Sequence, residues 1–234
     1  SPDGKTLATA GADKSVKLWN PADGKELKTL GAHDGSVYSL AFSPDGKLLA
    51  SAGAGKDSLV KVWDVKAQKE FTQLKGHEQP VTAVVFAGND VVVTASMDRS
   101  IRTWTTKNVA EPKKDTKEPE PKKGGTDKKD PKDKKDAKDT KEPKEVKPFK
   151  DPKELKKFGP TSDDPYSMAW SEKTKTLAVG GYSGQITLWA LDSEKPKLAK
   201  PIKSPGYCIA FTPDGKGVFT GHDNGTVAFT RIEK

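Results

Sequence analysis

Histidine, hydroxyl and carboxylate side chains recur at similar spacing in this sequence, and together they are the residue types of a nucleophilic triad. Thr94 is followed four residues later by Asp98, with His77 ahead of both, and His33 precedes Ser51 in the same way. In such a triad the histidine accepts the hydroxyl proton while the carboxylate orients the imidazole ring. This combination repeats along the chain, whereas a catalytic set is expected once. We therefore expect a structural role for these residues and no enzyme activity.

The elements that must position these residues are short strands. Apolar residues alternate with polar ones within residues 33–42, 48–53 and 59–64, and turn residues separate the runs. An apolar period of two residues predicts β-strands rather than helices. The turn Ser43-Pro-Asp-Gly46 suits a type I geometry, because proline presets φ at its second position and glycine tolerates the exit conformation.

The strand pattern repeats at a nearly constant interval. Trp19 and Trp63 are 44 residues apart, and Trp63 and Trp104 are 41 apart. Trp189 follows Trp104 after 85 residues, which is one interval plus an insertion of similar length, and Thr230 stands where a further tryptophan is due. A repeat of roughly 40–45 residues with four strands is typical of a propeller blade.

On these residues the chain resembles the WD-repeat family of β-propellers. The motifs that carry the resemblance are Gly76-His77, Gly31-Ala-His33, the dipeptide Trp63-Asp64 and the Ser/Thr-Pro-Asp-Gly-Lys turns that begin at residues 1, 43 and 212. The resemblance covers the whole chain except a charged tract. It implies an all-β propeller fold, with about five blades of a larger, seven-blade ring and a disordered charged insert.

The domain boundaries follow from the repeats and the charged tract. Blades are expected at 1–30 (partial), 31–74, 75–108, 156–202 and 203–234 (partial), and the insert at 109–155. The insert is almost wholly Lys, Asp, Glu and Pro, so it has too few apolar residues to offset the entropy of ordering. It follows a third strand, and the outer strand of that blade is expected to resume at 146–149 or at 155–158.

The resemblance also implies a buried hydrogen-bond relay in each blade. Its members are a histidine before the inner strand, a Ser or Thr on the second strand, an Asp in the next turn and the Trp of the third strand. A buried indole N–H and a buried carboxylate both need partners. The positions that fit are Thr9, Asp13 and Trp19; His33, Ser51, Asp57 and Trp63; and His77, Thr94, Asp98 and Trp104. The last two blades lack several members, so they are expected to depend on apolar packing.

The four tyrosines are the main candidates for partner binding. Tyr38, Tyr166 and Tyr207 share one position near the start of the inner strand, and Tyr182 precedes a turn. The resemblance places both positions on the top face around the central channel, the usual partner surface, and tyrosine is enriched at protein interfaces. The alternative is that the rings only pack around the channel mouth. The predicted partner-binding residues are Ser36, Tyr38, Thr82, Met97, Tyr166, Tyr182 and Tyr207.

Charge and composition limit the remaining function classes. The net charge is +8, but residues 109–154 contain 16 lysines against 13 acidic residues, so the tract is a mixed-charge segment rather than a basic arm. Nucleic-acid binding is therefore not expected. The single cysteine, Cys208, excludes an internal disulfide and is compatible with a reducing compartment such as the cytoplasm. No apolar run is long enough to span a membrane.

The expected function is that of a non-catalytic scaffold, which binds a peptide or protein partner on the top face. Two alternatives remain open. One is a regulatory or sensor module fused to an enzyme domain outside this segment, and the other is association with nucleic acid or acidic surfaces through the Lys-rich insert. No phosphate-binding loop or metal-ligand spacing occurs, so no cofactor and no metal are expected.

Overall fold

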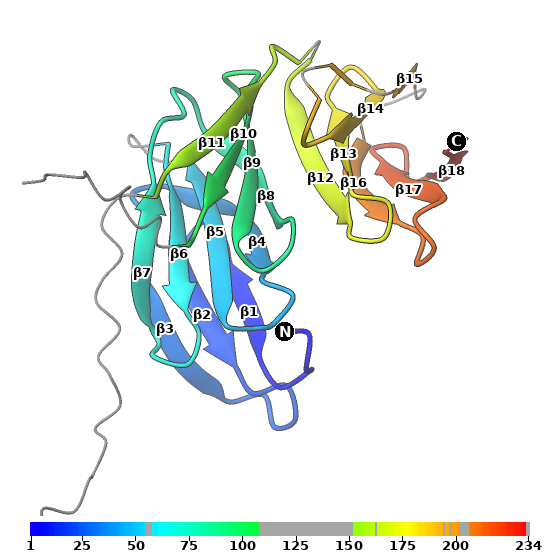
Figure 1. The fold of residues 1–234 in the computed structure, drawn as a ribbon. Coiled ribbons are helices and arrows are strands. Elements are labelled where there is room, and N and C mark those ends of the chain that lie inside the picture. Colours follow the sequence, from blue (N-terminus) through cyan, green and yellow to red (C-terminus); the bar gives the residue numbers. More distant parts are fainter. Residues whose placement is uncertain are drawn as a thin grey trace, which may run out of the picture.

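The computed structural model describes residues 1–54, 58–107, 152–161, 163–193, 195–196, 198–201 and 206–232. The regular secondary structure of these residues consists of β-strands alone (Figure 1). Eighteen strands form five antiparallel sheets. The all-β class predicted from the sequence is thereby confirmed. These residues include no helix that is long and apolar enough to cross a membrane.

Each sheet takes its strands in chain order, so that each is a meander. The first sheet contains β1 (Leu7–Ala10), β2 (Ser15–Trp19) and β3 (Glu26–Ala32), and the second contains β4 (Ser36–Phe42), β5 (Leu48–Ala54), β6 (Val60–Asp64) and β7 (Lys69–Leu74). The third contains β8 (Val81–Phe86), β9 (Val91–Ser96), β10 (Ile101–Thr105) and β11 (Glu154–Phe158). The fourth contains β12 (Pro165–Ser171), β13 (Thr176–Gly181), β14 (Gln185–Ala190) and β15 (Leu198–Pro201), and the fifth contains β16 (Gly206–Phe211), β17 (Gly217–His222) and β18 (Val227–Arg231).

The proline-containing turns at Ser43 and Thr212 join the first and second strands of their sheets, and the turn at Ser1 comes directly before β1. The backbone N–H of Gly46 donates to the carbonyl of Ser43 at 2.9 Å, and Gly46 has a φ of 70°. The Ser43 hydroxyl also donates to Asp45 at 2.7 Å. The turns that begin at Ser1 and Thr212 have the same backbone hydrogen bond, at 2.9 and 2.8 Å. Local sequence therefore sets these turns.

Four hydrophobic clusters lie between consecutive sheets and form the core. Each cluster contains residues of two consecutive sheets: Leu18 and Trp63 share one cluster, Val62 and Trp104 the next, Ala95 and Trp189 the third, and Leu188 and Val218 the fourth. The first strands of neighbouring sheets also lie side by side: β4 contacts β8, β8 contacts β12, and β12 contacts β16. The sheets therefore pack face to face in chain order, which is the arrangement of propeller blades.

Two glycines allow the tryptophans to approach the preceding sheet closely. A Cβ at Gly31 would lie 3.0 Å from the ring of Trp63, and one at Gly76 would lie 3.2 Å from the ring of Trp104. At Gly76 it would also lie 2.7 Å from the Arg102 guanidinium. Space for the tryptophan ring therefore explains the glycine that precedes each relay histidine.

A recurring ion pair identifies the outer strand of the third sheet. Lys17 pairs with Glu26 at 3.3 Å, Lys61 pairs with Glu70 at 3.0 Å, and Arg102 pairs with Glu154 at 2.9 Å. Each pair joins the tryptophan-bearing strand of a sheet to the outer strand of the same sheet. The third sheet therefore takes β11 from residues that follow the charged tract, at the second of the two predicted places.

The pairing of β11 with β10 moves one predicted boundary. Residues 156–158 belong to the third sheet, and not to the blade expected at 156–202. Residues 146–149 lie outside the described part, as does the predicted insert 109–155 apart from its last four residues. The other boundaries stay a prediction.

The fifth sheet has one face that no other described sheet covers. Phe219 and Phe229 lie on this face with 45% and 53% of their surface exposed, and their ring centroids are 5.0 Å apart. The register makes them equivalent to Ala178 and Leu188 of the fourth sheet, which are buried under the fifth. This free face therefore carries apolar residues at the positions that the next sheet covers in the fourth sheet.

Candidate functional site

The third sheet contains the complete predicted relay. The Trp104 indole Nε1 donates to the Thr94 hydroxyl oxygen at 2.9 Å, and that oxygen lies 2.7 Å from Nε2 of His77. Nδ1 of His77 lies 2.8 Å from the Asp98 carboxylate, which also accepts from Ser100. If Nδ1 carries the proton, every donor in this chain has an acceptor.

The charge states in this relay follow from burial and hydrogen bonding. Burial lowers the pKa of His77 and outweighs the Asp98 carboxylate, which raises it. Burial raises the pKa of Asp98, but hydrogen bonds from Ser100 and His77 outweigh it and bring the pKa to about 2. At neutral pH the relay therefore combines a neutral imidazole with a carboxylate.

The relay is inaccessible as a nucleophilic triad. The Thr94 side chain has 0% of its surface exposed, and His77 has 7%. A substrate carbonyl cannot reach a hydroxyl that is closed off by protein on all sides. The geometry therefore supports a structural role for these residues.

The second sheet repeats the central part of the relay. The Ser51 hydroxyl lies 2.7 Å from Nε2 of His33 and accepts from Nε1 of Trp63 at 2.8 Å. Burial lowers the pKa of His33 to about 4, and Lys61 contributes in the same direction. Asp57, the fourth predicted member, lies outside the described residues.

In the first sheet the tryptophan has its predicted hydroxyl but no histidine, and in the fourth sheet it uses a different hydroxyl. Trp19 donates to the hydroxyl of Thr9 at 2.7 Å, but the Asp13 carboxylate accepts from Ser15 and contacts no histidine among the described residues. Trp189 donates to the Thr187 hydroxyl at 3.0 Å. Sequence reasoning missed Thr187, although it stands two residues before the tryptophan, where the first three blades have Lys17, Lys61 and Arg102.

Three of the predicted binding residues form a cluster of aromatic rings. We call Tyr166 on β12, Tyr182 after β13 and Tyr207 on β16 the tyrosine cluster. The ring centroid of Tyr166 lies 5.6 Å from that of Tyr182 and 5.8 Å from that of Tyr207. Tyr182 is 54% exposed and Tyr207 is 48% exposed. The cluster therefore presents a substantial aromatic surface to solvent.

Tyr38 on β4 lies near the cluster without a ring contact among the described interactions. It is 55% exposed. Burial raises the pKa of Tyr166, and Tyr182, Tyr207, Asp164 and Tyr38 raise it further. These tyrosines and this carboxylate are therefore close enough to influence one another electrostatically, and the Tyr166 phenol is neutral at physiological pH.

The structure removes Thr82 from the predicted binding surface. Only 6% of Thr82 is exposed, and its hydroxyl donates to the Pro165 carbonyl of the next sheet at 2.5 Å. Thr82 stands at the position that Tyr38, Tyr166 and Tyr207 occupy in their own sheets. It joins two sheets there, whereas Tyr38 and Tyr207 are about half exposed. Ser36 and Met97 are half-buried at the same end of the sheets as the cluster. Their predicted binding role stays a prediction.

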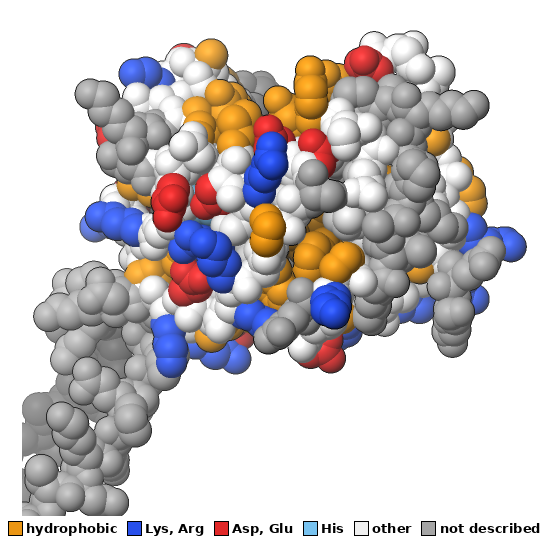
Figure 2. All heavy atoms as spheres, turned by 90° about the horizontal axis from the view of Figure 1, so that it is seen from above, with side chains coloured by type: hydrophobic (Ala, Val, Ile, Leu, Met, Phe, Trp, Pro, Cys, Tyr) orange, Lys and Arg blue, Asp and Glu red, His pale blue; other side chains and the backbone are white. Residues whose placement is uncertain are grey.

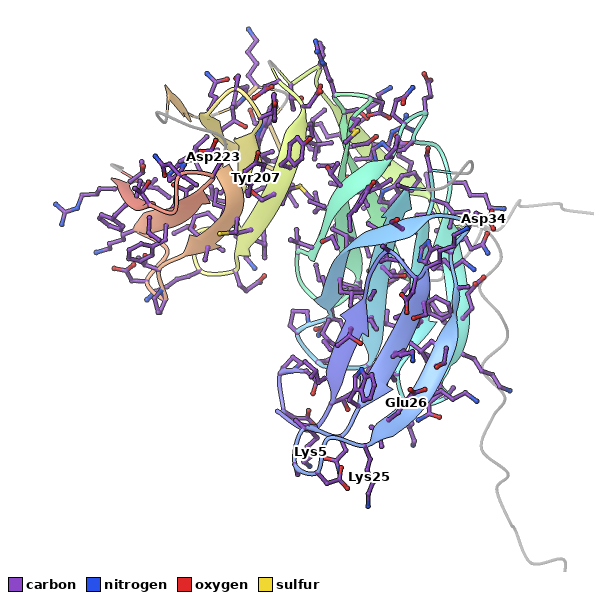
Figure 3. The ribbon with its side chains drawn as sticks, turned by 180° about the vertical axis from the view of Figure 1, so that it is seen from behind. Lys5, Lys25, Glu26, Asp34, Tyr207 and Asp223 are labelled. Carbon is purple, nitrogen blue, oxygen red and sulfur yellow. The ribbon has the colours of Figure 1, made fainter. Side chains whose placement is uncertain are left out.

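The loops at the cluster end of the sheets are acidic. Figure 3 shows Tyr207, Asp34 and Asp223 at this end, and Lys5, Lys25 and Glu26 at the opposite end. The described loop residues at the cluster end contain seven carboxylates against three basic side chains: Asp13, Asp34, Glu78, Asp98, Asp163, Asp164 and Asp223 against Lys14, Lys75 and Arg99. Figure 2 looks onto this end and shows apolar side chains beside acidic and basic ones.

The described residues hold no group of three or more His, Cys, Asp or Glu side chains arranged for a metal ion. His222, which is adjacent to Asp223 in sequence, instead lies with Nε2 3.0 Å from the hydroxyl of Thr220. The cluster end can thus offer aromatic faces, phenol hydroxyls and carboxylates to a ligand. Those groups suit recognition rather than bond-making chemistry.

Comparison with known proteins places these sheets in a family. Residues 1–20, 24–64, 68–105, 152–190 and 204–229 match the family described as "WD domain, G-beta repeat". These matches cover all five sheets in whole or in part and exclude most of the charged tract.

Curated relatives match over shorter stretches. The chain is 32% identical over 113 residues to the U5 small nuclear ribonucleoprotein 40 kDa protein of Dictyostelium discoideum, covering 48% of this chain and 31% of the relative. It is 38% identical over 98 residues to Lissencephaly-1 homolog 1 of Paramecium tetraurelia, covering 42% and 24%. It is 34% identical over 101 residues to Protein tipD of Dictyostelium discoideum, covering 43% and 16%. The matched stretch thus spans at most 31% of the length of these relatives. The family match and the meander sheets together show that the chain is a partial propeller and belongs to the WD-repeat family.

Proposed function

We propose that this chain is a non-catalytic interaction scaffold, which binds a peptide or protein partner at the end of the sheets that carries the tyrosine cluster. One observation carries the proposal: Tyr166 contacts the rings of Tyr182 and Tyr207, which come from two neighbouring sheets and each leave about half of their surface in solvent. WD-repeat proteins generally serve as interaction scaffolds, which agrees with this assignment.

The energetics of tyrosine favour this use of the surface. A tyrosine side chain buries about 150–250 Å² when a partner covers it fully. Tyrosine is also among the residues that contribute most to binding free energy at interfaces. Tyr166 contacts both exposed rings, and this contact limits the side-chain entropy that they can lose when a partner binds.

A pair of matched variants tests the proposal. Tyr182→Ala combined with Tyr207→Ala removes the two exposed rings, whereas Phe219→Ala removes an equally exposed ring from the free face of the fifth sheet. Proteins captured by the immobilised wild-type chain are identified and then titrated individually against each variant. We expect a partner that binds at least ten-fold more weakly to the double variant and unchanged to the control, with equal melting temperatures for all three chains. The absence of any such partner would refute the proposal.

A regulatory module joined to an enzyme domain would use the same surface. It differs from a free-standing scaffold only in what lies outside these residues. The open reading frame around this segment distinguishes the two, because an adjoining catalytic domain is required by the second and not by the first.

A further inference from the structure

We propose that the tyrosine cluster receives the cationic side chain of a lysine or arginine, presented by an extended segment of the partner. This inference rests on the proposed function and names the chemistry of the ligand. It follows from the arrangement of the rings together with the charge of the surrounding loops.

The three rings provide aromatic faces in different orientations. The plane of Tyr166 makes an angle of 32° with that of Tyr182 and 76° with that of Tyr207. The face of an aromatic ring carries partial negative charge and attracts a cation within about 6 Å of its centroid. Rings in mutual contact at different angles allow one cation to approach more than one aromatic side chain at once.

The carboxylates next to the cluster are only partly neutralised. Asp164 pairs with Arg99 at 3.0 Å. Asp163 accepts hydrogen bonds from the backbone N–H groups of Ser183 and Asp164, and no described Lys or Arg forms an ion pair with it. One negative charge beside the rings therefore remains without a cationic partner in the described residues.

The loops around the tyrosine cluster also carry net negative charge. The chain as a whole carries a net charge of +8. The described loops at the cluster end nevertheless have twice as many carboxylates as basic side chains, six against three, when Asp98 of the buried relay is left out. Such an end attracts cations and repels phosphate groups. The observations therefore favour a basic peptide over a nucleic acid or a phosphopeptide at this site.

Three blocked hexapeptides of alternating glycine and one variable residue test the proposal. The variable residue is lysine in the first, glutamine in the second and glutamate in the third, and each peptide carries the same fluorescent label for anisotropy titration. We expect the lysine peptide to bind at least ten-fold more tightly than the glutamine peptide and the glutamate peptide not to bind. Raising the salt concentration should lower the affinity for the lysine peptide several-fold, because salt screens the attraction between exposed charges.

Two substitutions at one position separate a cation–π contact from a hydroxyl contact. Tyr207→Phe keeps the aromatic face, so its affinity for the lysine peptide should stay within two-fold of the wild type. Tyr207→Leu removes the face, and a cation–π contact of about 0.5–1 kcal/mol corresponds to about a two- to five-fold loss. Phe219→Leu, on the free face of the fifth sheet, should leave the affinity unchanged.

Two results would overturn the inference: equal binding of the lysine and glutamine peptides, or equal losses for Tyr207→Phe and Tyr207→Leu. Either result leaves the proposed function intact if a protein partner still requires Tyr182 and Tyr207. If no protein partner requires these two tyrosines, the proposed function is wrong regardless of the peptide results.

Discussion

The relay of the third sheet predicts a large cost for removing one hydroxyl group. Thr94→Val keeps the shape of the side chain and its preference for a strand, but it removes the acceptor of the Trp104 N–H and the partner of His77 Nε2. Both partners are buried, with 2% and 7% of their surface exposed. A buried polar group left without a partner costs about 1–3 kcal/mol. Two such groups therefore predict a loss of about 2–6 kcal/mol.

The first sheet offers a matched control. Thr9→Val removes one hydrogen bond, from Trp19 at 2.7 Å. Thr9 is exposed, and Trp19 borders an open hollow of about 350 Å³, so water can replace the lost acceptor. We expect this change to cost less than about 1 kcal/mol. Thr94→Ser is a second control, because it keeps the hydroxyl and loses one methyl group, at about 1 kcal/mol.

Urea denaturation followed by tryptophan fluorescence measures these differences. The expected order of destabilisation is Thr94→Val, then Thr94→Ser, then Thr9→Val. If Thr94→Val costs no more than Thr9→Val, the relay does not stabilise the third sheet and the reasoning is refuted. If Thr94→Ser, which keeps the hydroxyl, costs as much as Thr94→Val, the loss of stability does not come from the hydroxyl group.

Three further predictions use other parts of the structure. A backbone hydrogen bond from Thr105 N to Lys153 O, at 3.1 Å, closes the segment 106–152. Replacing this segment with the four-residue turn Val65–Gln68 should raise the free energy of unfolding, measured in urea, by about 2 kcal/mol, because a shorter loop costs less closure entropy; a lower free energy of unfolding would contradict this. Between pH 7 and 5 the free energy of unfolding should fall, because unfolded His33 binds a proton near pH 6.5 whereas the folded side chain stays neutral until about pH 4. The loss is at most about 3 kcal/mol, is complete below pH 4 and should shrink in His33→Gln, as urea titrations at each pH can check. We expect the chain to self-associate through the exposed apolar face of the fifth sheet. Phe229→Lys places a charge on this face and should therefore reduce the association measured by sedimentation; a chain that sediments as a monomer, or association that the substitution leaves unchanged, would contradict this.

Strand positions, turns and the paired relay residues were predictable because they depend on local sequence. Thr94 and Trp104 sit ten residues apart on adjacent antiparallel strands, and their register brings Thr94 opposite Arg102, two residues before the tryptophan. Ser51 and Trp63 are related in the same way, with a longer turn between them. The period of two and the turn residues therefore suffice to bring these side chains together.

The position of β11 was left open between two segments because the charged tract separates it from its partner strand. A signal for the outer strand was present in the sequence. In the first three sheets the first or second residue of the outer strand is a glutamate that forms an ion pair with a basic residue of the tryptophan-bearing strand: Glu26, Glu70 and Glu154. Recognising that ion pair would have selected 154–158. No such signal in the sequence indicated that Thr82 is buried whereas Tyr38 and Tyr207 are exposed, because a contact with Pro165 of the next sheet buries Thr82.

The sequence by itself determined that this protein consists of repeated four-stranded units and where their turns lie. It also determined which hydroxyl accepts the hydrogen bond from the tryptophan in three of these units. Those features arise within one repeat, where alternation and turn chemistry act over a few residues. Only the tertiary structure decided which tyrosines share a surface, that Thr82 does not belong to it, and that β11 completes the third sheet. These features depend on how one sheet packs against the next and on pairing across the long insertion, which no local pattern of residues encodes.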